Sequence, residues 1–243
     1  MKYLIKENLD TISESDIRDT WNQIAIYFDK RRSERWEKCI DYINLIPANS
    51  CVIDLGCGNG RHLIPLAEKA NRAYGLDISE KMLETARKNN RAKCTNISLI
   101  QGSVATLPFH DNSFDAGLFI ATLHHVPTNQ KRIQALSEIK RVLKPEGTLL
   151  ISVWARYQER FVLHFIYDFI SRLLFHRAGE YGDILVEWKH EEKVSRFYHL
   201  FTLNEIKQLI LEAGLKIIEI KHVKIKSTIV PDNYFVLVKK DKN

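Results

Sequence analysis

The chain has 243 residues, 45% of them apolar and 27% charged, which fits one domain with a sizeable hydrophobic core. Its net charge of +6 is compatible with a polyanionic partner but does not establish one. The longest apolar runs fall well short of a membrane span and the N-terminus shows no secretory pattern, so we expect a cytoplasmic protein without a membrane segment.

Helical and strand periodicities alternate along most of the chain. Two helices are predicted near the N-terminus, over 14–29 and 33–46, and these are expected to form a helical cap within residues 1–47. Strands are predicted near 51–55, 73–76, 97–101, 114–120 and 147–153, and helices near 61–70, 79–91 and 129–143. This alternation predicts an α/β fold, in which helices cover both faces of a mainly parallel sheet.

Residues 155–200 interrupt the alternation. Phe161, Phe165, Phe169 and Leu173 recur every four residues there, which predicts an amphipathic helix with one broad apolar face. Two interpretations stay open: the helix covers the core, or the insertion forms a lid over a pocket beside the preceding strand. Beyond the insertion, the pattern predicts a helix over 202–213 and a closing pair of strands over 217–225 and 234–238.

The most informative segment is a glycine-rich turn between the strand predicted at 51–55 and the next helix. Asp54 lies at the end of the strand, and Gly56, Gly58 and Gly60 follow it with the spacing G-x-G-x-G. Glycines there allow backbone conformations barred to other residues and let a ligand approach closely. The spacing is one residue shorter than the dinucleotide fingerprint, which disfavours a dehydrogenase. Tight turns also use glycine, so the loop alone is a weak signal.

A second acidic residue, Asp77, ends the strand predicted near 73–76. Ligands of open α/β sheets bind at the carboxyl ends of the strands, and an acid there commonly holds the hydroxyls of a ribose. The alternative is that Asp77 caps the following helix, but Ser79 competes for that position. The sequence therefore favours a ribose-binding role for Asp77.

Together these segments resemble the class I S-adenosylmethionine-dependent methyltransferases. The resemblance also rests on Leu107-Pro108-Phe109, on Phe114-Asp115 and on residues 142–151, in the order expected of that family. It implies one methyltransferase domain over 1–243 with a Rossmann-like, mainly parallel sheet, an antiparallel C-terminal edge, and S-adenosyl-L-methionine as cofactor. The cofactor-binding residues that it implies are Asp54, Gly56, Cys57, Gly58, Gly60, Asp77, Ile78, Ser103, Val104 and Ile120.

Three further segments resemble one branch of that superfamily, the tRNA wobble-uridine carboxymethyl methyltransferases. They are residues 20–36, residues 120–126 with 132–136 behind them, and residues 196–201. The resemblance implies esterification of 5-carboxymethyluridine to 5-methoxycarbonylmethyluridine in the anticodon loop of tRNA. Relatives in this branch often work with a small zinc-binding activator subunit, which we expect to dock on exposed apolar residues near the edge of the sheet.

Two positions depart from the pattern of these relatives. Ser103 stands where the family usually has an acid that meets the adenine amino group, and a hydroxyl offers a weaker, uncharged hydrogen bond. Within the insertion, Glu187-Trp188 replaces a Pro-Trp pair. The first departure bears on the affinity for cofactor, and the second on contacts with substrate.

The chemistry of a carboxylate nucleophile constrains the acceptor site. The group is ionised at neutral pH and needs no general base, only alignment, removal of water and a cation such as a guanidinium to hold it. The resemblance places the branch's N-terminal arginine at Arg32, the alternative being a solvated surface charge. His124, the second predicted catalytic residue, is either a pocket wall and hydrogen-bond donor or a packed loop histidine. His125, Tyr198 and His199 are predicted to contact the substrate.

A basic segment near the C-terminus holds Lys221, Lys224 and Lys226. Such lysines either bind tRNA phosphates without reading the base sequence or protect an edge strand from aggregation. Both interpretations stay open.

Two alternatives to tRNA esterification also stay open. One is a methyltransferase with a small acceptor, such as a quinone precursor or a free carboxylic acid, and the other is an RNA-binding protein that holds the cofactor without turnover. The four cysteines give no C-x-x-C pair and no regular framework, so we expect reduced thiols and no metal site; they are Cys39, Cys51, Cys57 and Cys94.

Overall fold

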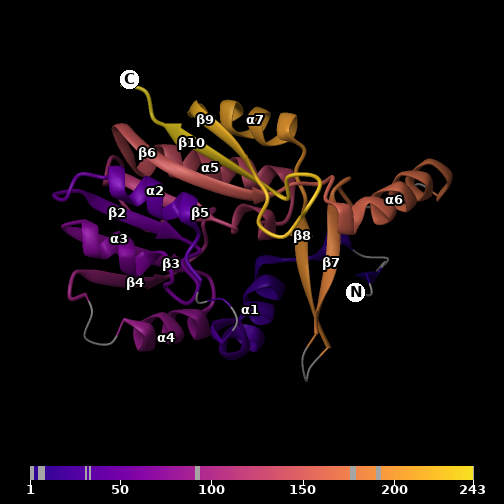
Figure 1. Cartoon of the computed structure of the whole chain (residues 1–243), viewed down its shortest axis with the longest axis horizontal. Coiled ribbons are helices and arrows are strands. Elements are labelled where there is room, and N and C mark those ends of the chain that lie inside the picture. Colours follow the sequence, from indigo (N-terminus) through magenta and orange to yellow (C-terminus); the bar gives the residue numbers. More distant parts are fainter. Residues whose placement is uncertain are drawn as a thin grey trace.

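A seven-stranded sheet forms the centre of the molecule in the computed structural model, which describes residues 3–4, 9–30, 32, 34–90, 94–175, 179–189 and 193–242 (Figure 1). The strand order is β4-β3-β2-β5-β6-β10-β9. The strands are β2 (Cys51–Leu55), β3 (Arg72–Asp77), β4 (Ile97–Gln101), β5 (Phe114–Ile120), β6 (Leu143–Trp154), β9 (Lys216–Val223) and β10 (Asn233–Lys239). The strands from β2 to β6 are parallel, and β10 is antiparallel to both neighbours. The predicted fold class and its antiparallel edge are confirmed.

Helices cover both faces of this sheet because successive side chains of a strand point to opposite faces. Val52 and Leu118 belong to the same buried cluster as α2 (Glu37–Leu45) and α3 (Leu63–Lys69). Their neighbours Ile53 and Phe119 pack with α5 (Asn129–Val142) and α7 (Leu203–Glu212) on the other face. Burying each such side chain contributes about 1.5–3 kcal/mol, which is why these apolar strands occupy the middle of the sheet. Between β3 and β4 runs α4 (Glu80–Asn89).

The insertion contains a β-hairpin as well as the predicted helix. After α6 (Val162–Phe175), β7 (Asp183–Lys189) and β8 (Lys193–His199) pair antiparallel, and β1 (Tyr3–Leu4) joins β7 at its outer edge. This hairpin was not predicted from the sequence. The side chains of residues 183–186 are all buried, so β7 lacks the alternation of apolar and polar residues that marks a half-buried strand.

The two N-terminal helices pack in different places. Helix α1 (Glu14–Asp29) begins with a capping box between Ser13 and Asp16, and its Ile24 and Ala25 are buried against α4 and the hairpin. Helix α2 packs on the sheet itself. Position 33, where the second helix was predicted to begin, lies outside the described residues, and α2 starts at Glu37.

Helix α6 extends away from the sheet beside the hairpin (Figure 1). Its inner side is buried with β7 and β8 through Phe165, which follows the buried Phe161, whereas Leu163, Phe169 and Leu173 are exposed. No described residue of α6 lines either of the two cavities characterised below. Helix α6 itself therefore covers core with its inner side only, and the interpretation of the insertion 155–200 as a lid stays a prediction. Among the helices that the structure describes, none has the length and apolar character needed to cross a bilayer.

Candidate active site

Two adjoining cavities lie at the carboxyl ends of the parallel strands, where β2 separates β3 from β5. One has an empty volume of about 920 Å³, counting its part open to solvent, and the other about 560 Å³. We name the first the glycine-loop pocket and the second the arginine pocket. The residues that line both are Trp21, Phe28, Arg61, Ala121 and His125.

The glycine-loop pocket is built on the turn that follows β2. Gly56 and Gly58 have positive φ angles of 68° and 52°, where side chains other than glycine are strained. A Cβ atom on Gly56 would overlap the side chain of Thr122, whereas one on Gly58 would meet no protein atom within 4 Å. Gly56 is therefore required for packing, and Gly58 keeps space beside the loop open for a ligand.

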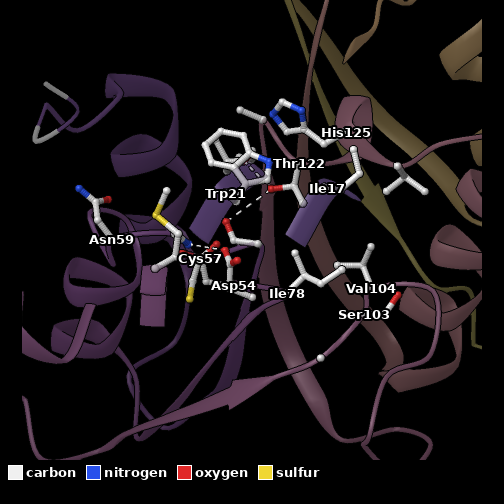
Figure 2. A pocket seen from close by; sticks show the side chains of 18 of the residues that line it. Ile17, Trp21, Asp54, Cys57, Asn59, Ile78, Ser103, Val104, Thr122 and His125 are labelled. Carbon is white, nitrogen blue, oxygen red and sulfur yellow. Dashed lines mark hydrogen bonds between the residues drawn. The ribbon is translucent and has the colours of Figure 1, made fainter. Parts of the chain in front are cut away.

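Asp54 is a buried carboxyl group at the centre of this pocket (Figure 2). Burial raises its pKa to about 8, although the nearby charge of Arg61 acts in the opposite direction. Its Oδ2 atom has no hydrogen-bond partner among the described residues. Because an unpaired buried oxygen is unfavourable, the site suits a ligand that brings a hydrogen-bond donor, above all a cationic one.

Asp77 lines the same pocket from the end of β3. One carboxylate oxygen accepts the N–H of Gly58 at 2.8 Å and the other accepts the N–H of Ser79 at 2.9 Å. Burial nevertheless raises the pKa of Asp77 to about 6. Helix α4 is capped by the side chain of Ser79, which accepts the N–H of Met82, as the sequence predicted. Each Asp77 oxygen keeps a second lone pair for a ligand.

The other walls are largely apolar. Figure 2 shows Ile78, Val104 and Ser103 to the right of Asp54. Trp21, Thr122 and His125 lie above Asp54 in the same view. The hydroxyl of Ser103 accepts the N–H of Ala105 at 3.1 Å, which leaves its own proton for a ligand. The predicted cofactor-binding residues that line the pocket are Asp54, Gly56, Cys57, Gly58, Asp77, Ile78, Ser103, Val104 and Ile120.

Gly60 is the predicted cofactor-binding residue that does not line the pocket. Its φ angle is 80°, and a Cβ atom there would lie 3.3 Å from the Cβ of Ala86 in α4. The third glycine of the motif thus allows α4 to approach the loop, and it shapes the turn rather than a ligand contact.

The arginine pocket combines aromatic rings with positive charge. Trp154 and Tyr198 stack with their ring centroids 4.4 Å apart, and the guanidinium of Arg160 lies 4.4 Å from the Trp154 ring centroid. Its cationic residues are Arg32, Arg61, Arg160, Arg196 and Lys226. Among the lining residues, Asp232 is the carboxylate, and it already accepts the N–H groups of residues 225–227 at 2.7, 2.7 and 3.1 Å. The pocket therefore suits an anionic ligand with a flat ring.

Asn59 fixes the segment that carries Arg32. Its amide donates to the side chain of Asp29 at 2.9 Å and to the carbonyl of Arg32 at 3.2 Å. Asn89 of α4 donates to the same Asp29 at 2.7 Å. The glycine loop and the end of α1 are thereby tied together. The sequence analysis did not select Asn59, although its place inside the G-x-G-x-G motif is a signal that could have been used.

Both adjacent histidines line the arginine pocket and are buried. Nδ1 of His124 accepts the N–H of Trp154 at 3.3 Å, so Nε2 carries the ring proton and is the donor. Nδ1 of His125 pairs with the carbonyl of Phe197 at 2.8 Å. Burial lowers the pKa of His124 well below its usual value and that of His125 to about 3, so both rings are neutral at pH 7.

His199 lies in neither cavity, and its predicted contact with substrate is wrong for this structure. It is buried, and its two ring nitrogens lie 2.6 Å from carboxylate oxygens of Asp183 and Glu205. Arg156 in turn donates to Glu205 at 2.6 Å. With both ring nitrogens at hydrogen-bond distance from carboxylates, His199 belongs to a polar network that ties β8 to α7 and lines neither cavity.

The remaining predicted residues, Arg32, His124, His125 and Tyr198, do come together in the arginine pocket. The structure adds residues that the sequence analysis missed, above all Arg160 and Arg196 of the insertion. Arg160 and Arg196 come from separate elements, and the fold of the insertion brings both of them to the arginine pocket.

Comparison with protein families and curated proteins agrees with this site. Residues 53–151 match the family model described as a methyltransferase domain. Over 196 residues the chain is 31% identical to a putative methyltransferase of Encephalitozoon cuniculi, a match that covers 79% of this chain and 83% of that protein. Over 154 residues it is 32% identical to tRNA (carboxymethyluridine(34)-5-O)-methyltransferase ALKBH8 of Mus musculus. That match covers 63% of this chain and 22% of the longer mouse protein, about a fifth of its length.

Solved structures share the fold. A SAM-dependent methyltransferase from Methanosarcina mazei superposes with a TM-score of 0.72 at 21% identity, covering 86% of this chain and 100% of that one. A complex between the Trm112 methyltransferase activator and a putative methyltransferase of Haloferax volcanii gives a TM-score of 0.67 at 19% identity, covering 95% and 99%. These likenesses extend over nearly the whole chain.

The fold, the glycine loop and the matching proteins place the chain in one class of enzyme. It belongs to the S-adenosylmethionine-dependent methyltransferases, and its cofactor is S-adenosyl-L-methionine. The glycine-loop pocket fits this cofactor, because the unpaired Asp54 oxygen suits a cationic ligand and Gly58 leaves room beside the loop.

Proposed function

We propose that this methyltransferase esterifies the carboxylate of 5-carboxymethyluridine at the wobble position of tRNA, giving 5-methoxycarbonylmethyluridine. The observation that carries the proposal is the arginine pocket, which adjoins the cofactor site and offers stacked rings, several cations and, among its described lining residues, no carboxylate that is not already hydrogen-bonded. Single-stranded bases are read by stacking on aromatic rings, and guanidinium groups bind carboxylates. Relatives named as tRNA carboxymethyluridine methyltransferases in Mus musculus and Arabidopsis thaliana support the same acceptor.

The cofactor is held, in this proposal, by residues of the glycine-loop pocket. Asp77 accepts from the ribose hydroxyls and Asp54 from a cationic group of the cofactor, while Ile78 and Val104 flank the adenine and Ser103 donates to it. When bound, S-adenosyl-L-methionine supplies an electrophilic methyl group on a sulfonium. The carboxyl groups of Asp54 and Asp77 also complement the positive charge of the sulfonium.

The acceptor needs orientation rather than activation. Arg32 binds the carboxylate, Tyr198 belongs to the aromatic wall beside the uracil ring, and His124 offers its Nε2 proton to a substrate oxygen. Because the carboxylate is already ionised, no residue has to remove a proton, and neutral histidines are adequate. Closure of the pocket around the carboxylate removes water from it and aligns it with the methyl group.

A product assay tests this function. The protein is incubated with methyl-labelled cofactor and two preparations of one tRNA, one bearing 5-carboxymethyluridine and the other unmodified at the wobble uridine. We expect label in the first tRNA alone, 5-methoxycarbonylmethyluridine in its digest by mass spectrometry, and release of the label by mild alkali because an ester is base-labile. Label in both tRNAs, or label that survives alkali, would contradict esterification. Labelling of small molecules in place of tRNA would favour the small-acceptor alternative.

An activator subunit stays a prediction. The Haloferax volcanii complex with Trm112 supports it by analogy of fold. The expected exposed apolar residue near a sheet edge is present as Ile218 on β9, although more of them lie on α6. We expect a Trm112-type protein to raise the methyltransferase activity and to make the sample more monodisperse in light scattering. Equal activity and a monodisperse sample without any partner would count against it.

A further inference from the structure

Arg196 carries a buried positive charge that no described residue neutralises. The residue is 6% exposed, and its Nε atom has no hydrogen-bond acceptor. Among the described residues its guanidinium makes no ion pair, and its contacts are with the rings of Trp188 at 4.5 Å and Tyr198 at 5.2 Å. Ring faces attract a cation but do not replace the hydrogen bonds that burial has removed.

The surroundings of Arg196 make this charge less favourable still. It lines the arginine pocket together with Arg32, Arg160 and Lys226. Burial lowers the pKa of Arg196, and the charge of Arg32 acts in the same direction. The carboxylate of this pocket, Asp232, is held by three backbone N–H groups and the Asn233 amide. An anion that enters the pocket is therefore the natural partner of Arg196.

A second buried arginine, Arg132, has the partners that a guanidinium with a structural role requires. Arg132 of α5 is fully buried, but it pairs with Glu180 and donates to the carbonyl of Val126 at 3.0 Å. Both side chains are buried and both leave Nε without a hydrogen-bond acceptor, so the two arginines differ in that Arg132 has an anionic partner among the described residues and Arg196 does not. Because no described residue supplies an anion for Arg196, a ligand that enters the pocket is the candidate for this role.

We propose that Arg196 anchors the carboxylate of the acceptor, with Arg32 as the second guanidinium, and that loss of the carboxylate charge on methylation drives release of the product. This inference rests on the proposed function. A carboxylate oxygen takes the methyl group; the new O–C bond replaces the S–C bond, whose electron pair stays on sulfur, and no proton moves. The ester is neutral, so Arg196 loses its counter-charge at the moment of reaction and the pocket favours the next carboxylate.

The test uses the full chain with the demethylated cofactor, so that no turnover occurs. Three anticodon stem-loop RNAs, identical except for a carboxymethyl, carbamoylmethyl or methoxycarbonylmethyl group on the wobble uridine, are titrated by calorimetry. The wild type is expected to bind the carboxylate roughly 10- to 100-fold more tightly than either neutral form, the range for hydrogen bonds to a charged group. Arg196→Met is expected to bind all three RNAs alike, and Arg196→Lys to restore part of the preference.

Melting temperatures separate an anchoring role from a structural one. Arg196→Met removes an unpaired buried charge and is expected to melt no lower than the wild type, whereas the matched variant Arg132→Met removes the ion pair with Glu180 and the hydrogen bond to Val126 and melts lower. If Arg196→Met keeps the preference for the carboxylate, the anchoring role is wrong while the esterification stands. If Arg196→Met melts as low as Arg132→Met and weakens all three RNAs equally, Arg196 is structural and the inference is overturned. A wild type without any preference overturns both the inference and the proposed function.

Discussion

The two pockets of this enzyme differ in how they are built and in their charge. The glycine-loop pocket is formed largely by strand ends and the turns next to them, and its buried carboxyl groups are Asp54 and Asp77. The arginine pocket is assembled from α1, the turn after β5, the segment after β6, the hairpin and the segment between β9 and β10, and its charges are cationic except for Asp232. In the proposed reaction each pocket is complementary to one reactant, a sulfonium in the first and a carboxylate in the second. Variants in the first pocket should therefore impair binding of the cofactor, and variants in the second should impair binding of the acceptor.

The largest expected effect is the loss of cofactor binding in Gly58→Val. A Cβ atom at this position meets no protein atom within 4 Å, so the valine side chain is expected to project into space that the ligand needs. Calorimetry with S-adenosyl-L-methionine should detect no binding, while circular dichroism shows a folded protein with a somewhat lower melting temperature because of the positive φ angle.

Gly214→Ala is the matched control for that variant. Gly214 also has a positive φ angle, 73°, but it follows α7 and lines neither pocket. It should show the backbone strain without the loss of affinity. Wild-type cofactor affinity in Gly58→Val would contradict the assignment of the glycine-loop pocket.

Next in size is the effect of Arg32→Ala on turnover. Loss of charge-assisted hydrogen bonds to the carboxylate should lower kcat/KM for carboxymethyl-modified tRNA by roughly 10- to 100-fold. Cofactor affinity should stay unchanged, because Arg32 lines the arginine pocket and not the other. Arg32→Lys should recover little activity, since a point charge cannot reproduce two parallel hydrogen bonds. Full turnover by Arg32→Ala would remove Arg32 from the mechanism and strengthen the small-acceptor alternative.

The difference between the pockets also explains what the sequence could predict. The predicted cofactor residues lie beside strands and glycines, whose positions follow from local periodicity, and all of them except Gly60 line the glycine-loop pocket. Gly60 lies outside the lining because a positive φ angle serves packing as well as binding, and the motif does not distinguish the two. The hairpin was missed because burial of both faces hides the alternation of a strand.

The error at His199 has a simple geometric cause. In a strand, successive side chains point to opposite faces, so Tyr198 and His199 cannot both face one pocket. Arg196 and Tyr198 share a face and both line the arginine pocket. Had the segment 193–199 been recognised as a strand, this period would have selected Arg196. That Arg196 lacks a counter-charge depends on tertiary contacts and could not be predicted from the sequence.

A smaller effect should appear in the pH dependence of stability. Asp54 has a pKa of about 8 in the folded protein, above the value of about 3.9 expected in the unfolded chain. The folded state therefore holds a proton that the unfolded state releases. This contribution to stability is fully present below pH 4 and is lost as the pH rises towards 8. Without cofactor, the free energy of unfolding of the wild type should fall by about 2–4 kcal/mol more than that of Asp54→Asn between pH 5 and pH 8.

The pH dependence of cofactor affinity gives a second test of the pKa of Asp54. A cationic ligand favours the ionised carboxylate, so the affinity of the wild type for S-adenosyl-L-methionine should rise over the same pH range. Asp54→Asn should bind more weakly, with little dependence on pH. If the free energies of unfolding of the wild type and of Asp54→Asn change equally between pH 5 and pH 8, Asp54 is ionised over that whole range. That result would conflict with its buried and unpaired position.

The smallest expected effect concerns the exposed Lys224, just beyond β9 and close in sequence to Lys226 of the arginine pocket. If the anticodon arm passes over this end of the sheet, Lys224→Gln should weaken tRNA binding a few-fold and lower the slope of log Kd against log salt by about 0.7–0.9, the value for one phosphate contact. The preference for the carboxymethyl group should not change, because a phosphate contact positions the RNA without reading the base. Lys38→Gln is the control, since Lys38 lies on α2 and already pairs with Asp41 at 3.0 Å. An equal slope for both variants would mean that Lys224 only protects the edge of the sheet, and that the tRNA reaches the arginine pocket from another side.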